Sequence, residues 1–243
     1  AGGCEASKPS LTQPPQHPDT PFRVFIGFDV RQPLAYHVAR SSVERHASRR
    51  VQVEPLRLDW VPMTRRGLTE FTYTRWLVPW LCEFKGSALF MDSDTIARTD
   101  VTELEHLVDP LMAVSVVKGP LRFEWSSVMF FQCDNASCQT LTPEYVQQER
   151  IQPGSFRWLR DPLRLGTLPP EWNHLVLYEE PNPSAKILHY TAGIPCWPET
   201  QHSPLAALWH EERDAALSTV SWSDLMGRSV HRPVVRALEL AGV

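Results

Sequence analysis

A short apolar run that leads into two acidic residues constrains the fold of this chain more than any other stretch. Ala88-Leu89-Phe90-Met91 is typical of a buried strand in a parallel sheet, and Asp92-Ser93-Asp94 follows it directly. In an open α/β sheet, ligands bind beyond the carboxyl ends of the strands, where we expect these acids to lie. Two neighbouring carboxylates repel each other unless a cation, usually a divalent metal, lies between them. Asp-x-Asp alone is also common in solvated turns, and its position after a buried strand is what strengthens the case for a metal site.

The composition indicates one large globular domain, with or without a tail. The chain has 243 residues, of which 42% are hydrophobic and 21% are charged. A net charge of −4 and the lack of a basic run argue against a nucleic-acid partner. No apolar run is long enough for a transmembrane segment. The five cysteines form no Cys-x-x-Cys pair, so we expect reduced thiols, no zinc site and a cytoplasmic location.

Three regions of the chain differ in their patterns. Residues 1–21 are rich in proline, so we expect a flexible tail. The first residue is Ala rather than Met, so we expect a processed chain or a fragment, and a removed targeting segment stays open. Residues 22–200 alternate strand and helix patterns, which indicates an α/β domain, and we expect 201–243 to extend it with helical segments. The expected strands are 23–29, 51–58, 88–91, 113–117, 127–131 and 186–190, and the expected helices are 33–47, 70–81 and 203–217.

Five motifs between about Phe22 and Trp197 occur in the order found in a known enzyme family. They are Tyr73-Thr74-Arg75, Phe90-Met91-Asp92-Ser93-Asp94, Trp125-Ser126-Ser127-Val128-Met129, Leu168-Pro169-Pro170-Glu171-Trp172-Asn173 and His189…Gly193…Pro195…Trp197. The set resembles family 8 glycosyltransferases, which are retaining enzymes that include glycogenin and bacterial galactosyltransferases. The resemblance implies a GT-A-like single domain over 22–200, with a Rossmann-like mixed central sheet flanked by helices. It also implies transfer of a sugar from a nucleotide-sugar, most simply a UDP-sugar, with retention of configuration.

The resemblance also assigns roles to individual residues. Asp92 and Asp94 match the family's Asp-x-Asp motif, which binds Mn²⁺ and, through the first acid, the ribose of the donor. His189 matches the histidine that completes the metal site. Carboxylates suit Mg²⁺ as well as Mn²⁺, and the imidazole favours Mn²⁺. The residues predicted to bind the donor are Phe28, Asp29, Arg31, Arg75, Asp92, Ser93, Asp94, Ser126, Ser127, Trp172, Asn173, Gly193 and Trp197. The catalytic candidates are Arg75, Glu124 and Asp161.

Two departures from the family pattern affect the donor site. Trp125-Ser126-Ser127 stands where the family has Asn-Ser-Gly, so we expect a differently shaped sugar pocket. Pro195-Cys196-Trp197 stands where the family has Lys-Pro-Trp, so the lysine that meets the diphosphate is missing, and Arg31 or Arg75 would have to compensate. Asp161 is only the acid nearest to the expected place of the family's Asp-Gln-Asp.

Alternatives remain open for single residues and for the whole chain. Taken alone, His189 suits an ordinary buried histidine, Arg75 an ion pair, and Asp161 a turn. The rival function is a non-catalytic nucleotide- or sugar-binding protein on a degenerate transferase scaffold. A nucleotidyltransferase is less suitable because Gly27-Phe28-Asp29-Val30-Arg31 is not a Gly-rich phosphate loop. The acceptor, whether a glycan, a lipid-linked sugar or a small molecule, is expected to bind among loop 119–126, the region 142–166 and the C-terminal helices.

Overall fold

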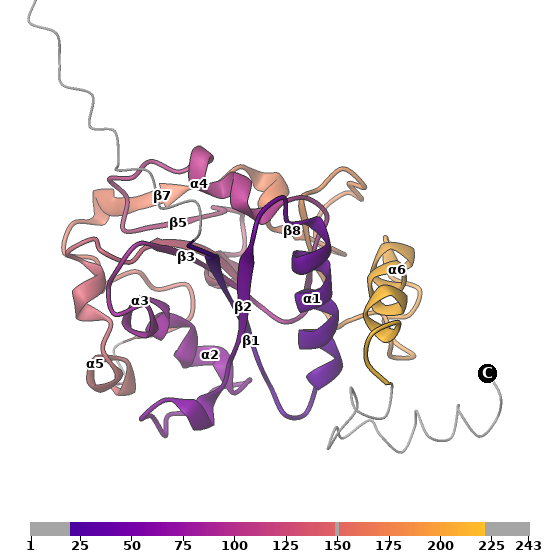
Figure 1. The fold of residues 1–243 in the computed structure, drawn as a ribbon, viewed down its shortest axis with the longest axis horizontal. Helices are drawn as coiled ribbons and strands as arrows, with labels where there is room; N and C mark the ends of the chain where they lie inside the picture. The colour runs from indigo at the N-terminus through magenta and orange to yellow at the C-terminus, as the bar shows by residue number, and fades with distance from the viewer. Residues whose placement is uncertain (1–19, 149–150, 222–243) are drawn as a thin grey trace, which may run out of the picture.

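The protein is an α/β body built around a six-stranded sheet, with a second sheet of three short strands (Figure 1). The computed structural model describes residues 20–148 and 151–221. The strands of the large sheet are β1 (Phe22–Gly27), β2 (Val51–Leu56), β3 (Ser87–Met91), β5 (Val114–Val116), β6 (Val128–Gln132) and β7 (Leu165–Thr167), and those of the small sheet are β4 (Thr95–Ala97), β8 (His174–Leu175) and β9 (Ile187–His189). The α-helices are α1 (Pro33–His46), α2 (Phe71–Thr74), α3 (Val78–Leu81), α4 (Leu104–Leu107), α5 (Pro143–Gln147) and α6 (Ala206–Leu217).

The large sheet is mixed, with strand order β2-β1-β3-β6-β5-β7. Strand β1 pairs in parallel with β2 and with β3, whereas β6 is antiparallel to both β3 and β5. The predicted parallel pairing of β3 is therefore correct on one side only. Ala88 to Met91 in β3 are all fully buried, as expected for a strand covered on both faces. Pro55 is tolerated in β2 because this strand lies at the edge of the sheet.

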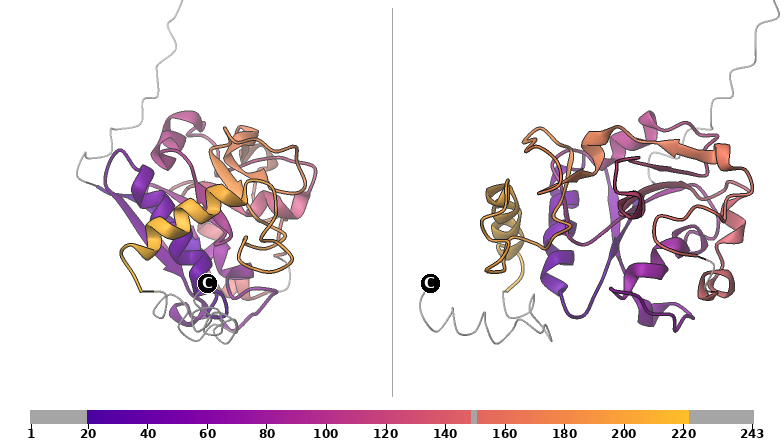
Figure 2. Two further views of the ribbon diagram at one scale, coloured as in Figure 1. Left: turned by 90° about the vertical axis from the view of Figure 1, so that its right-hand side faces the viewer. Right: turned by 180° about the vertical axis from the view of Figure 1, so that it is seen from behind.

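Helices cover both faces of the large sheet (Figure 1). Helix α1 lies on one face, and α2, α3 and α5 lie on the other. Helix α6 packs on the outside of α1, away from the sheet (Figure 2). A buried acid anchors α6, because Glu212 has no exposed surface and its carboxylate is 3.0 Å from the guanidinium of Arg45 in α1. These layers leave the carboxyl ends of β1 and β3 free to carry polar side chains.

The ends of β1 and β3 and the start of β6 meet at one edge of the large sheet. We call this edge, which carries Asp92 and Asp94, the polar corner. Ile26 in β1 is paired with Met91 in β3, so the residues that follow both strands emerge together. Strand β6 begins opposite Met91, and the carbonyl of Ser127 just before it accepts a hydrogen bond from the Asp92 amide (2.8 Å). Residues from three separate parts of the sequence therefore lie side by side at this edge.

The small sheet brings a fourth part of the chain to the same corner. Strand β4 starts immediately after Asp94 and runs antiparallel to β9, with Thr95 opposite His189. The Tyr190 amide donates to the carbonyl of Asp94 at 2.9 Å, which continues this pairing. The backbone ladder thus fixes His189 next to the two acids.

One predicted helix is wrong as a continuous element. Residues 70–81 form α2, a 3₁₀ turn over Arg75–Leu77, and α3. Pro79 explains the interruption, because its ring clashes with the carbonyl four residues earlier, at Arg75, and it offers no amide hydrogen. The region 142–166, whose pattern is unclear, contains α5 and the start of β7. The predicted tail and the helical segments of 221–243 lie outside the described residues, apart from residues 20, 21 and 221.

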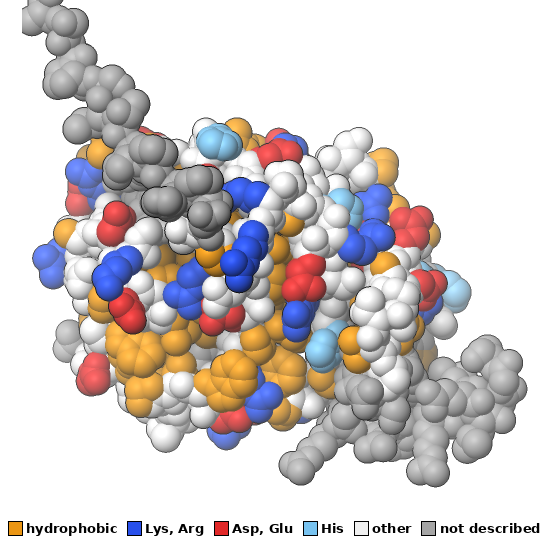
Figure 3. All heavy atoms as spheres, viewed as in Figure 1, with side chains coloured by type: hydrophobic (Ala, Val, Ile, Leu, Met, Phe, Trp, Pro, Cys, Tyr) orange, Lys and Arg blue, Asp and Glu red, His pale blue; other side chains and the backbone are white. Residues whose placement is uncertain are grey.

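The surface and the helices give two further observations. On the face viewed in Figure 3, acidic and basic side chains are interspersed, with an apolar area over its lower half. Within the described ranges, no helix combines the length and the apolar character needed to cross a lipid bilayer.

Gly27, the last residue of β1, sets the distance between the sheet and α2. A Cβ at this position would stand 2.4 Å from the ring of Phe71 in α2. We therefore expect Gly27→Ala to lower the free energy of unfolding by about 1–3 kcal/mol, measured by urea denaturation. Gly119→Ala is the matched control, because an added Cβ there meets nothing within 4 Å. Equal stability of the two variants would contradict this account of the packing.

Candidate metal centre

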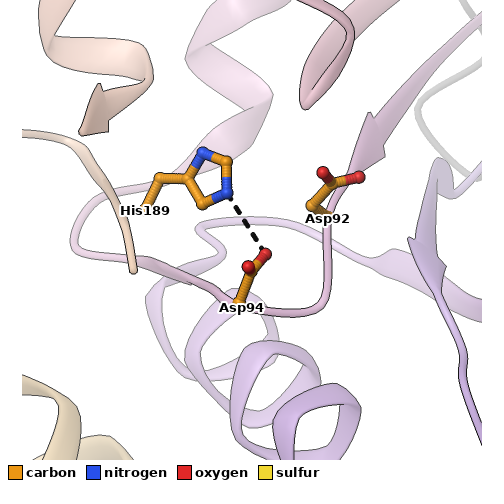
Figure 4. A group of neighbouring side chains, drawn as sticks. All are labelled: Asp92, Asp94 and His189. Carbon is orange, nitrogen blue, oxygen red and sulfur yellow. Dashed lines mark ion pairs between the residues drawn. The ribbon is translucent and has the colours of Figure 1, made fainter. Parts of the chain in front are cut away.

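The structure brings the three predicted metal ligands together at the polar corner (Figure 4). Asp92 follows β3, Asp94 precedes β4, and His189 is the last residue of β9. One ligand atom from each residue lies within 4.8 Å of the other two, so a single ion can reach all three. Nε2 of His189 is 3.2 Å from Oδ1 of Asp94.

The donor atoms of this group suit a divalent cation. Oδ1 of Asp92 and Oδ1 of Asp94 are both buried, and among the described residues each forms an ion pair, with Arg75 or with His189, but no hydrogen bond of regular geometry. The contact between Arg75 Nη1 and Asp92 Oδ1, at 3.0 Å, is an ion pair without hydrogen-bond geometry. Buried carboxylate oxygens of this kind are costly unless a cation binds them. Two carboxylates and one imidazole match the ligand preferences of Mn²⁺. The two carboxylates also suit Mg²⁺, which binds imidazole nitrogen less readily.

The protonation of the metal-free site follows from burial and from the mutual influence of its charges. Burial raises the pKa of Asp92 to about 7; nearby Arg75 opposes this change, and the negative charge of Asp94 adds to it. Burial lowers the pKa of His189, but the charge of Asp94, its close contact with the imidazole, and the charges of Glu124 and Asp92 outweigh burial and raise it to about 9. The metal-free site thus retains protons near neutral pH, and a cation has to displace them.

Arg75 supplies the fixed positive charge of the site. Its side chain is buried, and Nη1 donates to the carbonyl of Ser126 at 2.8 Å and to Oδ2 of Asp92 at 3.3 Å. The 3₁₀ turn that begins at Arg75 directs this side chain toward the strand ends. The predicted proximity of Arg75 to the metal acids is confirmed.

Asn173 fixes which nitrogen of His189 faces the acids. Nδ2 of Asn173 donates to the carbonyl of Glu124 at 3.1 Å, which leaves its Oδ1 as an acceptor. This Oδ1 is 3.1 Å from Nδ1 of His189, so Nδ1 carries the hydrogen and donates it. In a neutral imidazole the lone pair is then on Nε2, which points toward Asp94 and the metal position.

Glu124 lies on the Nδ1 side of the His189 imidazole, whereas the two acids lie on its Nε2 side. Its carboxylate accepts hydrogen bonds from Ser127 Oγ at 2.6 Å and from the Thr191 hydroxyl, and it is 3.7 Å from Nδ1 of His189. Sequence reasoning missed Thr191, which no motif marks. Its contact with Glu124 depends on the packing of the β9 end against the 3₁₀ helix Arg122–Ser126.

The loop after β1 is held by Asp29. This buried carboxylate accepts hydrogen bonds from the backbone and side chain of Arg31 and from the Glu70 amide. Burial raises the pKa of Asp29, but these hydrogen bonds outweigh it and keep the pKa below its usual value. Arg31 also donates to the carbonyl of Leu68 at 2.7 Å. The guanidinium carbon of Arg57 lies over the ring of Phe28, 4.8 Å from the centre of that ring.

The remaining predicted residues occupy different environments. Ser93, Ser126 and Ser127 are buried beside the acids. Trp172 lies fully in the core, with the Lys186 ammonium over its ring, so the polar contact of its motif comes from Asn173.

The hydrogen bonds of Gly193 and Asp161 go to residues other than the three ligands. Gly193 has a φ of 122°, and its amide donates to the Tyr190 carbonyl; Trp197 packs in the cluster of α1 and α6. Asp161 Oδ1 accepts from the Leu163 amide at 2.9 Å, and its Oδ2 is 3.5 Å from Arg164 Nε. The catalytic roles of Arg75, Glu124 and Asp161 stay predictions, as do all the predicted donor contacts.

Comparison with known proteins places the chain in a family. No family model matches it. It is 30% identical over 228 residues to Protein CDI of Arabidopsis thaliana, with 80% of this chain and 86% of that protein covered. The chain belongs to the Protein CDI family. The name of that relative states no activity, so the fold and the site carry the functional argument for this family member.

Solved structures identify the fold of this Protein CDI family member. The bifunctional glycosyltransferase WbbM matches with a TM-score of 0.63 at 15% identity, over 90% of this chain and 53% of WbbM. GlyE of Streptococcus pneumoniae TIGR4 matches with a TM-score of 0.60 at 17% identity, over 86% of this chain and 63% of GlyE. The galactosyltransferase LgtC matches with a TM-score of 0.56 at 12% identity, over 80% of this chain and 96% of LgtC. The fold is that of GT-A glycosyltransferases, as predicted, and the chain spans about half to two thirds of WbbM and GlyE.

Glu124→Gln tests whether the group behind His189 affects metal binding. We expect Mn²⁺ to bind about tenfold more weakly, because the variant removes a negative charge 3.7 Å from Nδ1 of His189 that favours a cation on the imidazole, while Asn173 still accepts the Nδ1 hydrogen. Calorimetric titration with Mn²⁺ measures the change. Glu180→Gln, at an exposed position, is the control and should bind as the wild type does. Unchanged affinity in Glu124→Gln would show that this carboxylate does not act on the ligand.

The two raised pKa values predict a pH-dependent stability. Relative to the unfolded values of 3.8 and 6.5, the folded metal-free chain holds a proton on Asp92 up to about pH 7 and on His189 up to about pH 9. The folded state therefore binds more protons, and its stability falls as pH rises through these windows. Because a cation replaces those protons, we expect Mn²⁺ to raise the unfolding midpoint more at about pH 8 than at about pH 6. An equal shift at both pH values in calorimetric scans would contradict the assignment.

Proposed function

We propose that this protein is a metal-dependent glycosyltransferase that moves a sugar from a nucleotide-sugar, with a UDP-sugar as the leading donor, to an acceptor. The observation that carries the proposal is the Asp92, Asp94 and His189 group at the strand ends of a GT-A fold, with two buried carboxylate oxygens that accept no regular hydrogen bond from the described residues. Membership of family 8, use of Mn²⁺ and retention of configuration rest on the motif resemblance.

Three sets of residues would prepare the donor site around a bound metal. A bound Mn²⁺ or Mg²⁺ would act as a Lewis acid on the departing diphosphate. Arg75 holds Asp92 and the Ser126 carbonyl in place, and its charge offsets part of the negative charge of the corner. Asn173 holds the imidazole of His189 in the form that can bind a metal. Asp29 and Arg31 brace the loop after β1, where we propose that the nucleotide base binds.

The acceptor proton does not require Glu124 as a base. This carboxylate already accepts hydrogen bonds from Ser127 and Thr191, and it stands behind His189. We therefore assign Glu124 to positioning the metal ligand. The departing diphosphate is itself able to take the proton from the acceptor hydroxyl.

The alternative is a non-catalytic nucleotide- or sugar-binding protein that keeps the fold. The replacement of the expected lysine by Pro195 favours it, because a cation for the diphosphate is then missing from that position. The retained set of candidate metal ligands, Asp92, Asp94 and His189, argues against this alternative. Slow, metal-dependent hydrolysis of UDP-sugars in the absence of an acceptor would favour the enzyme, whereas binding of UDP without any turnover would favour the alternative.

The direct test is calorimetric titration of UDP with and without Mn²⁺. We expect binding that requires the metal and that weakens at least about 100-fold in Asp94→Ala, since loss of an outer-shell partner alone costs about 10–100-fold. Asp134→Ala, at an exposed position, is the matched control and should bind UDP as the wild type does. Absence of UDP binding with any divalent metal would overturn the UDP-sugar assignment.

A further inference from the structure

A cavity of about 860 Å³ opens beside the 3₁₀ helix Arg122–Ser126 and the segment 152–159. Its lining includes the arginines Arg122 and Arg157 and the aromatic rings of Phe123 and Phe156, and it includes no acidic residue of the described chain. The cavity therefore combines positive charge with apolar ring surface.

A short series of contacts connects this cavity with the metal centre. The amide of Gly154, which lines the cavity, donates to Oγ of Ser126 at 3.3 Å. The carbonyl of Ser126 in turn accepts from Arg75, which is paired with Asp92. The cavity wall and the metal centre thus share contacts with Ser126, which places them close together.

The close contact between segment 152–159 and the 3₁₀ helix depends on a glycine. Gly154 has a φ of +68°, and a Cβ on it would stand 2.4 Å from the carbonyl oxygen of Arg122. No other residue type fits this position without moving the backbone. The wall of the cavity therefore has a defined shape next to the metal centre.

The two guanidinium groups have donors available for a ligand. Nε of Arg122 donates to the carbonyl of Gly154 at 3.3 Å, and its guanidinium lies 5.2 Å from the ring centre of Trp125. Arg157 is exposed. Neither arginine forms an ion pair with an acid of the described chain; Asp161, close by in sequence, is paired with Arg164. Two such groups suit a carboxylate or a phosphate, which they can bind through paired hydrogen bonds.

The aromatic part of the lining suits a sugar ring. Phe123 is 56% exposed, which leaves its ring accessible to pack against the apolar face of a pyranose.

We propose that this cavity binds the acceptor, and that the acceptor is a saccharide carrying a carboxylate or a phosphate group. The inference rests on the proposed function, since it places the acceptor beside the donor site. In the reaction, the acceptor hydroxyl oxygen forms the bond to the anomeric carbon while the bond from that carbon to the diphosphate breaks. The hydroxyl proton leaves with the diphosphate.

The test is a ligand-observed NMR titration of the full chain without metal or nucleotide. Three probes share one ring, namely methyl glucuronide, glucose 6-phosphate and neutral methyl glucoside. We expect one of the two anionic probes to bind at least about tenfold more tightly than methyl glucoside, because hydrogen bonds to charged groups are the stronger kind. Whether the carboxylate or the phosphate probe binds more tightly identifies the acceptor group.

Arg157→Gln and Arg122→Gln should each weaken binding of the anionic probe by about tenfold and leave methyl glucoside unaffected. Arg50→Gln, which removes an exposed arginine that does not line the cavity, is the matched control. Because Arg157 is exposed and forms no ion pair with the described residues, its variant is expected to fold even if Arg122→Gln does not.

Three results would overturn the proposal. They are equal binding of neutral and anionic sugars, no binding of either anionic sugar, and binding of inorganic phosphate as tight as that of the sugars. The metal-dependent binding of UDP is measured separately on the same protein. Loss of UDP binding with retained binding of the anionic sugar would count against the proposed donor only, whereas the reverse result would count against the acceptor site only.

Discussion

The repulsion between two acids at the end of a buried strand is the constraint on which this site depends. Asp92 and Asp94 are separated by one residue, and each has a buried oxygen without a hydrogen bond to any described residue. Arg75 and His189 offset part of their charge, one from the broken helix and one from the small sheet. Burial strengthens the electrostatic repulsion between the two carboxylates, because little water screens it. A divalent cation would bind these buried oxygens of both acids at once.

The fold supplies the positions that this balance requires. Because β1 and β3 are parallel, the loops that follow them lie at the same edge of the sheet. Strand β6 is antiparallel to β3, so the segment that precedes β6 lies at this edge too. Strand β4 then leads from the acids into the pairing with β9 that carries the histidine. Each ligand is thus attached to a strand end whose neighbours are fixed by backbone hydrogen bonds, which favours a site of defined geometry.

The two sides of the site differ in their chemistry. On the proposed donor side, the negative charge of the acids dominates and would attract a divalent metal. On the proposed acceptor side, Arg122 and Arg157 give a positive cavity with exposed aromatic surface. Ser126 connects the two, because it contacts both Arg75 and Gly154. The positive charge of the proposed acceptor cavity would attract an anionic group that the two acids repel.

The sequence by itself determined the elements whose signal is local. The apolar run of β3, the proline at the start of α1 and the Asp-x-Asp spacing depend only on neighbouring residues, and the structure confirms them. Motif order also led to His189 and to the GT-A fold. The tertiary structure alone decided the hydrogen bonds among Asn173, His189, Glu124 and Thr191, and the cavity beside Arg122. The physical reason is sequence separation, because contacts such as that of Glu124 with Thr191 exist only once distant elements have packed, and no local pattern encodes which partners will meet.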